Sequence, residues 1–91
     1  MKHFDDHRAA KAWYTTDTLG RPNALISYST TVAEVTADRW LYINGLYSMT
    51  TRKHLGWFMK LLGLTYQDAK DLYNRGWKLN LDTGEALPVA E

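Results

Sequence analysis

The chain has 91 residues, no cysteine and a formal net charge of +1. This length favours a single domain over residues 1–91 with one hydrophobic core. The lack of cysteine excludes a disulfide framework and a thiolate metal site. The net charge is too small to indicate nucleic-acid binding by itself, because phosphate affinity requires clustered cations.

The chain contains no run of 18 apolar residues, and two aspartates follow its first four residues. Neither feature is typical of a membrane span or a signal peptide. The sequence therefore predicts a soluble, cytoplasmic protein without membrane contact. No motif indicates a cofactor, and none is predicted.

Residues 1–14 predict a short helix or, alternatively, a partly ordered arm. Three alanines favour the helix, and Asp5 or Asp6 can cap it. His3 and His7 stand four residues apart, a spacing that can place two imidazoles on one metal. No third ligand lies nearby in the sequence, so no metal site is predicted.

A β-meander is predicted over residues 24–49. Residues 15–23 have the glycine, proline and Asx chemistry of a loop, and residues 24–36 predict one strand with a bulge near Thr30. Trp40 to Ile43 should return antiparallel to it.

Asn44 and Gly45 have the composition of a type I′ turn, which would fold residues 46–49 back on residues 40–43. The alternative is a bulge within one continuing strand. Both versions give two or three antiparallel strands.

Small hydroxyl side chains accumulate on this sheet and after it. They favour a solvated face or, alternatively, a patch for a phosphate or a partner strand. None is predicted to be a nucleophile, because His54 has no carboxylate at short spacing. The set comprises Ser27, Ser29, Thr30, Thr31, Ser48, Thr50 and Thr51.

Two helices are predicted over residues 50–75. Thr50 or Thr51 can cap the first, and Leu55, Phe58 and Leu62 recur at helical spacing as its buried stripe.

The opposite side of the first helix carries the strongest binding signal. Lys53, Trp57 and Lys60 are spaced to share one exposed face, and Thr50 and Arg52 are close to it. A tryptophan between two lysines offers stacking area flanked by positive charge. Cations in a first helical turn oppose the macrodipole, which suggests another role for them. The alternative is that Trp57 packs under a terminal segment.

Thr65 and Asp68 resemble a capping box at the start of the second helix. The segment 55–74 resembles the helix-turn-helix motif in part, although Met59 stands where that motif has a small residue. The resemblance implies DNA or RNA binding by the second helix, against which two exposed carboxylates argue. The polar candidates on this helix are Gln67, Lys70, Asn74 and Arg75.

Residues 77–89 predict a C-terminal β-hairpin. Trp77, Leu79 and Leu81 alternate with polar residues, and Pro88 restricts the second strand to an edge. The predicted fold is thus α+β: a small antiparallel β-meander packed against a helical pair, with a C-terminal β-hairpin.

The segments SYSTTVA (residues 27–33) and LYINGLYSMTTRKH (residues 41–54) are similar to small uncharacterised proteins encoded by bacteriophages and prophages. The resemblance implies a protein made in a bacterial host, where such proteins commonly bind and inhibit host proteins. It implies no catalytic residues.

Two hypotheses follow. The first is a non-enzymatic module that binds a host protein through Thr50, Arg52, Lys53, Trp57 and Lys60. The second is a nucleic-acid-binding regulator that uses the segment 55–74. An enzyme is not predicted, and pairing of exposed sheet edges into a homodimer stays open.

Overall fold

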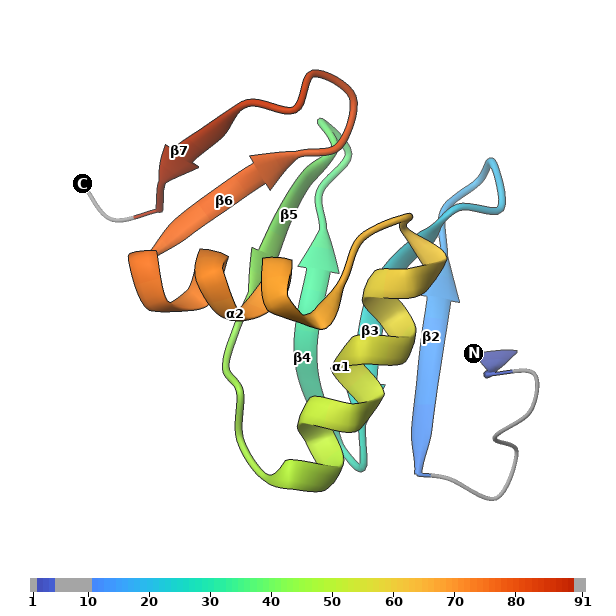
Figure 1. The fold of residues 1–91 in the computed structure, drawn as a ribbon. Coiled ribbons are helices and arrows are strands. Elements are labelled where there is room, and N and C mark those ends of the chain that lie inside the picture. The colour runs from blue at the N-terminus through green and yellow to red at the C-terminus, as the bar shows by residue number, and fades with distance from the viewer. Residues whose placement is uncertain (1, 5–10, 90–91) are drawn as a thin grey trace.

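The computed structural model describes residues 2–4 and 11–89. Seven antiparallel strands follow one another across the sheet in chain order, and two helices are inserted between the fifth and sixth strands (Figure 1). The elements are β1 (Lys2–His3), β2 (Ala12–Thr16), β3 (Pro22–Ser27), β4 (Thr30–Val35), β5 (Trp40–Ile43), α1 (Met49–Leu61), α2 (Tyr66–Arg75), β6 (Trp77–Asn80) and β7 (Ala86–Pro88). The predicted α+β class and the C-terminal hairpin β6–β7 are confirmed.

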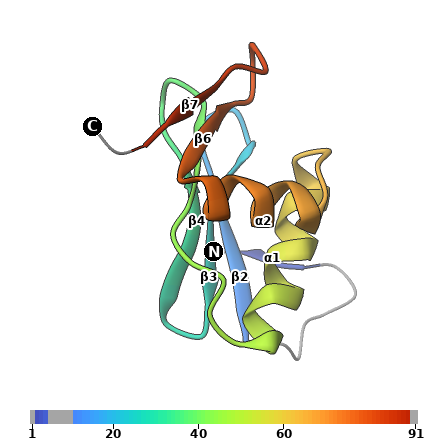
Figure 2. The same cartoon turned by 60° about the vertical axis from the view of Figure 1, so that its left-hand side comes forward.

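Both helices cover the same face of the sheet (Figure 2). α1 packs on β3 and β4, whereas α2 packs on β5 and β6. Neither of these two helices is long and apolar enough to span a membrane. The opposite face of the sheet carries no helix within the described residues.

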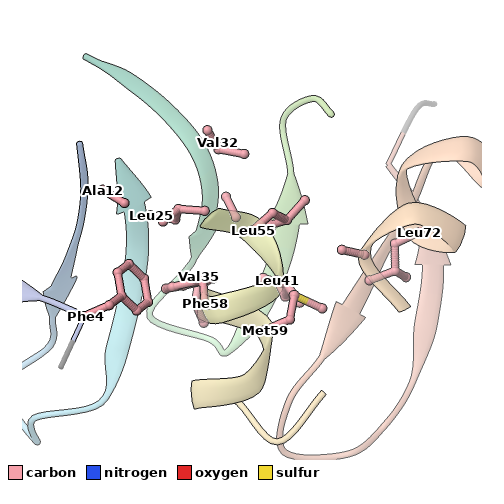
Figure 3. Packing of buried hydrophobic residues seen from close by; sticks show 12 residues of the cluster. Phe4, Ala12, Leu25, Val32, Val35, Leu41, Leu55, Phe58, Met59 and Leu72 are labelled. Carbon is pink, nitrogen blue, oxygen red and sulfur yellow. The ribbon is translucent and has the colours of Figure 1, made fainter. Parts of the chain in front are cut away.

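The core lies between the two helices and the sheet (Figure 3). It consists of Phe4, Ala12, Leu25, Val32, Ala33, Val35, Leu41, Leu55, Phe58, Met59, Ala69 and Leu72. Burial of one such large side chain stabilises the fold by about 1.5–3 kcal/mol. A chain of this size therefore depends on a few large residues.

The buried stripe of α1 matches the sequence prediction at Leu55 and Phe58, which are fully buried. Leu62 is only half-buried, and Met59 is fully buried instead. The helix begins earlier than expected, because Ser48 is the N-cap and its Oγ accepts a hydrogen bond from the amide of Thr51. A serine at this position satisfies one otherwise unpaired amide.

The predicted N-terminal helix is wrong where the structure describes it. Ala12 to Thr16 form β2, in which Ala12 pairs with Ser27 and Trp13 with Ile26. Four of its residues are aromatic or β-branched, and these side chains suit a sheet better than a helix. Lys2 and His3 form the strand β1, and residues 1 and 5–10 of that predicted helix lie outside the described residues.

The predicted bent strand 24–36 is two strands. Tyr28 and Ser29 form a tight turn between β3 and β4, and Tyr28 has a positive φ of 57°. A bulge is nevertheless present, because Leu25 pairs with Ala33 but Ile26 pairs with Thr31. Val32 is the extra residue, so it lies in the core together with its neighbour Ala33.

The predicted hairpin at Asn44 and Gly45 is also wrong. The neighbours of β5 are β4 and β6, so no strand folds back from residues 46–49. Asn44 instead bonds to β4 through its amide, which donates to the carbonyl of Val32. The chain then leaves the sheet for α1. Long-range pairing with β6 has replaced the local turn.

The loop predicted at residues 15–23 is shorter than expected, because Thr15 and Thr16 belong to β2 and Pro22 and Asn23 belong to β3. The remaining turn is organised by Asp17. Its carboxylate accepts hydrogen bonds from the amides of Leu19 and Arg21 at 2.9 and 3.0 Å, and from Arg21 Nε at 2.8 Å. These bonds, chiefly the one from the Arg21 amide, hold the pKa of Asp17 below its ordinary value.

The lowered pKa predicts a pH-dependent contribution to stability. The Asp17→Asn variant should be less stable than the wild type near neutral pH. Because the folded-state pKa is depressed, the difference should persist above about pH 4 and shrink as the pH falls through the folded value. Urea unfolding from pH 7 to pH 2.5 measures it, with Thr18→Ala in the same loop as control. A difference independent of pH would show that the charge contributes nothing.

Candidate functional site: a cationic groove between the helices

A groove with a volume of about 410 Å³ runs between α1 and α2. Its lining residues are Met49, Arg52, Lys53, Gly56, Tyr66 and Lys70. Three of the six are cations and none is an acid. The groove is therefore locally positive in a chain whose net charge is only +1.

The periodicity of α1 explains which side chains reach the groove. Met49, Arg52, Lys53 and Gly56 are spaced at i, i+3, i+4 and i+7, and so they share one helix face. Leu55 and its neighbours in the buried stripe face the sheet. The groove residues of α1 thus lie on a different side of the helix from the buried stripe, and they include both cations and the apolar Met49.

α2 supplies the other wall. Tyr66 is half-buried and packs against the core, and Lys70 stands one turn later on the same face. A complete capping box fixes the start of this helix: Thr65 Oγ1 accepts from the Asp68 amide, and the Asp68 carboxylate accepts from the Thr65 amide. The position of Tyr66 at the groove is therefore well defined.

Gly56 lies on the floor of the groove, where the helices approach each other. A Cβ atom built on it would lie 3.6 Å from Tyr66 Cβ, an ordinary van der Waals distance. One methyl group fits there, whereas a longer side chain would project into the groove.

Gly56→Ala should therefore stabilise the protein by about 0.5–1 kcal/mol, because alanine has a higher helix propensity than glycine. Urea unfolding measures the change. A loss of stability would mean that the helices are packed more tightly than the structure shows.

The electrostatics of the groove suit an anionic guest. The first turn of α1 contains no acidic residue, so the partial positive charge of the helix end is not offset there. Arg52 and Lys53 add two full charges beside it. Arg52 Nε is buried and has no hydrogen-bond partner among the residues that the structure describes. A buried guanidinium nitrogen without a hydrogen-bond partner costs stability.

The groove combines residues that the sequence assigned to different surfaces. Arg52 and Lys53 belong to the predicted partner-binding set, and Lys70 belongs to the predicted nucleic-acid set. Thr50 and Lys60 are exposed on α1 but do not line the groove. No sequence signal predicted that the start of α1 would face Lys70, because this depends on how the two helices cross.

Trp57 differs most from the sequence prediction of an exposed stacking surface. It is half-buried and packs against the core, with its ring centroid 5.7 Å from that of Phe4 and 5.1 Å from that of His54. Lys53 Nζ lies 5.6 Å from the indole. The alternative that the N-terminal segment packs on Trp57 is thus the one observed.

The polar residues of α2 do not form one uniform face for nucleic acid. Gln67 Nε2 donates to Asp71 Oδ1 at 2.9 Å, and the guanidinium of Arg75 lies 5.4 Å from the ring of Trp77. Lys70 belongs to the groove, and Asn74 is exposed. Two of the four side chains predicted to contact nucleic acid, Gln67 and Arg75, thus contact other residues of the protein instead.

Three of the seven predicted hydroxyl residues, Ser27, Ser48 and Thr51, are hydrogen-bonded to one another, and two of them are buried. Ser27 Oγ lies 2.8 Å from His54 Nδ1 and 3.1 Å from Thr51 Oγ1. Ser48 Oγ extends the network with a bond to Thr51 at 3.2 Å. Ser27 and His54 are each 2% exposed, so this network joins α1 to β3 inside the protein. No local pattern predicts this contact between residues 27 positions apart.

The fold and the groove define a small α+β domain with an antiparallel sheet, helices on one face and a positively charged groove between them. The chain belongs to a family of unknown function (DUF8033), whose model matches residues 4–75. All residues that line the groove fall within the match, whereas the hairpin β6–β7 lies beyond it. No curated protein and no solved structure matches this chain.

Proposed function

We propose that this protein is a non-enzymatic binding module that holds an acidic, partly apolar segment of another protein in the groove between α1 and α2. The observation that carries the proposal is the lining of the groove, in which three cations surround Met49 and Tyr66. Arginine, methionine and tyrosine are enriched at protein interfaces, and lysine provides charge complementarity.

The apolar part of the lining favours a protein partner over nucleic acid. Met49 is 78% exposed at the groove, and a flexible thioether adapts to varied apolar side chains. A phosphate backbone requires a longer array of cations, and the outer side of α2 carries Asp71. Binding of DNA or RNA through the helical pair is the alternative function.

The resemblance to phage and prophage proteins suggests the setting of this interaction. In that setting the partner is a protein of the bacterial cytoplasm, and binding inhibits or modulates it. This context stays a prediction.

Affinity capture from a bacterial lysate tests the proposal. The bait is the wild-type protein or the variant R52E/K53E/K70E, and the lysate is treated with nuclease. Lys53 and Lys70 are exposed, and circular dichroism verifies that the variant is folded. We expect the wild type to retain a protein that the variant loses.

A charge-matched control separates the groove from general electrostatics. The variant K2E/K11E/K60E reverses three exposed lysines outside the groove and should capture the same protein as the wild type. Capture that nuclease abolishes would favour the nucleic-acid alternative, and equal loss in both variants would contradict a groove-specific site.

A further inference from the structure

The face of the sheet opposite the helices is unusually aromatic. Both helices lie on the other face of the sheet (Figure 2). Residues of this face alternate along the strands with those of the core, so their side chains lie on the side away from α1 and α2. Trp13, Ile26, Trp40 and Tyr42 lie on this face, and each is half-buried without belonging to the core cluster. Partly exposed apolar side chains that share one uncovered face are candidates for an interaction surface.

Charged side chains are placed symmetrically on this face. Glu34 on β4 pairs with Tyr42 on β5, and the pairing of Leu41 with Leu79 places Lys78 on β6 beside Tyr42. Lys78 Nζ donates to Tyr42 Oη at 3.3 Å and lies 4.7 Å from the ring of Trp40. The three strands β4, β5 and β6 therefore carry an acid, an aromatic residue and a base side by side, namely Glu34, Tyr42 and Lys78.

This row is complementary to itself. A two-fold axis that runs parallel to β5 above Tyr42 exchanges the positions of β4 and β6 between two copies. Glu34 of each copy then lies opposite Lys78 of the other, and the two tyrosines meet at the axis. Two sheets packed face to face keep their strands nearly aligned, about 10 Å apart, which this arrangement satisfies.

We propose that two copies of this chain associate through the open faces of their sheets, with the Glu34–Tyr42–Lys78 row at the two-fold axis. The aromatic side chains supply the apolar area, and the two symmetric ion pairs fix the alignment. Both cationic grooves then lie on the outside, one on each helical layer. The interaction does not depend on the function proposed for the grooves.

Sedimentation velocity from micromolar to millimolar protein concentration tests this dimer. The wild type should form dimers with a measurable dissociation constant. Glu34→Lys alone, and Lys78→Glu alone, place like charges together at both symmetric contacts, and each should raise that constant by roughly tenfold or more. Circular dichroism verifies that the variants are folded.

Mixing the two single variants gives the decisive result. The Glu34→Lys variant carries lysine at both positions 34 and 78, and the Lys78→Glu variant carries glutamate at both. An equimolar mixture should therefore form heterodimers, in which every contact joins a lysine and a glutamate. A monomeric wild type at millimolar concentration would overturn the proposal. Undiminished dimers in both single variants would show that this row is not the contact, and a mixture that stays monomeric would contradict the alignment.

Discussion

Replacing Phe58 with alanine should destabilise the protein by about 3–5 kcal/mol, the range for truncation of a buried phenylalanine. Phe58 is fully buried at the centre of the single core, between α1 and the sheet. A domain of this length has a total stability of roughly 5–13 kcal/mol, so the variant should lose a large part of it. Urea unfolding followed by circular dichroism measures the loss.

The matched control is Leu61→Ala on the same helix. Leu61 is 45% exposed, so its truncation should cost less than about 1 kcal/mol. If both variants lost the same stability, the side of α1 that faces the sheet would be assigned incorrectly.

Removing the hydroxyl of Ser27 should cost about 1–3 kcal/mol, because His54 Nδ1 and Thr51 Oγ1 would lose a buried hydrogen-bond partner. The cost is large for one oxygen atom because water does not reach this site easily. Ser29→Ala in the exposed turn after β3 is the control, and it should change stability by less than about 0.5 kcal/mol.

A double-mutant cycle isolates the bond between Ser27 and His54. The variants are Ser27→Ala, His54→Leu and the two combined. The double variant leaves neither partner unpaired, so it should be less destabilised than the sum of the single variants, by about 1 kcal/mol. Strict additivity would show that the 2.8 Å contact contributes no coupling energy.

Local patterns predicted the elements with strong periodicity or clear caps. The apolar spacing of Leu55 and Phe58 identified α1, and Thr65 with Asp68 identified the start of α2. The alternation at Trp77 and Leu79 identified β6. In each case the local preference and the tertiary environment agree, so the local sequence was sufficient to predict the element.

The errors arise where long-range pairing outweighs local preference. Ala12 was assigned to a helix, but its partner is Ser27 on β3. Asn44 and Gly45 have the composition of a hairpin turn, yet β5 pairs with β6 across the two inserted helices. The local preference of a short segment carries no information about strand partners that are distant in the sequence.

The candidate site was predicted only in part, because it too depends on contacts between segments that are distant in the sequence. The unfavourable cations at the start of α1 pointed to Arg52 and Lys53, and both line the groove. The contribution of Lys70 and the covering of Trp57 by Phe4 depend on the packing of separate segments. The reasoning behind those cations was wrong, because α1 begins at Met49 and Arg52 therefore lies beyond the first turn. A tryptophan between lysines was likewise not sufficient to predict exposure.

The most direct test of the groove is a titration of isotope-labelled protein with a defined peptide, followed by amide chemical shifts. The probe is a blocked twelve-residue peptide of alternating glutamate and leucine, and the control peptide has glutamine in place of every glutamate. We expect saturable shifts for residues around Arg52, Gly56 and Lys70 with the acidic peptide, and much weaker binding of the control. Shifts confined to the open face of the sheet, or equal affinity for both peptides, would contradict it.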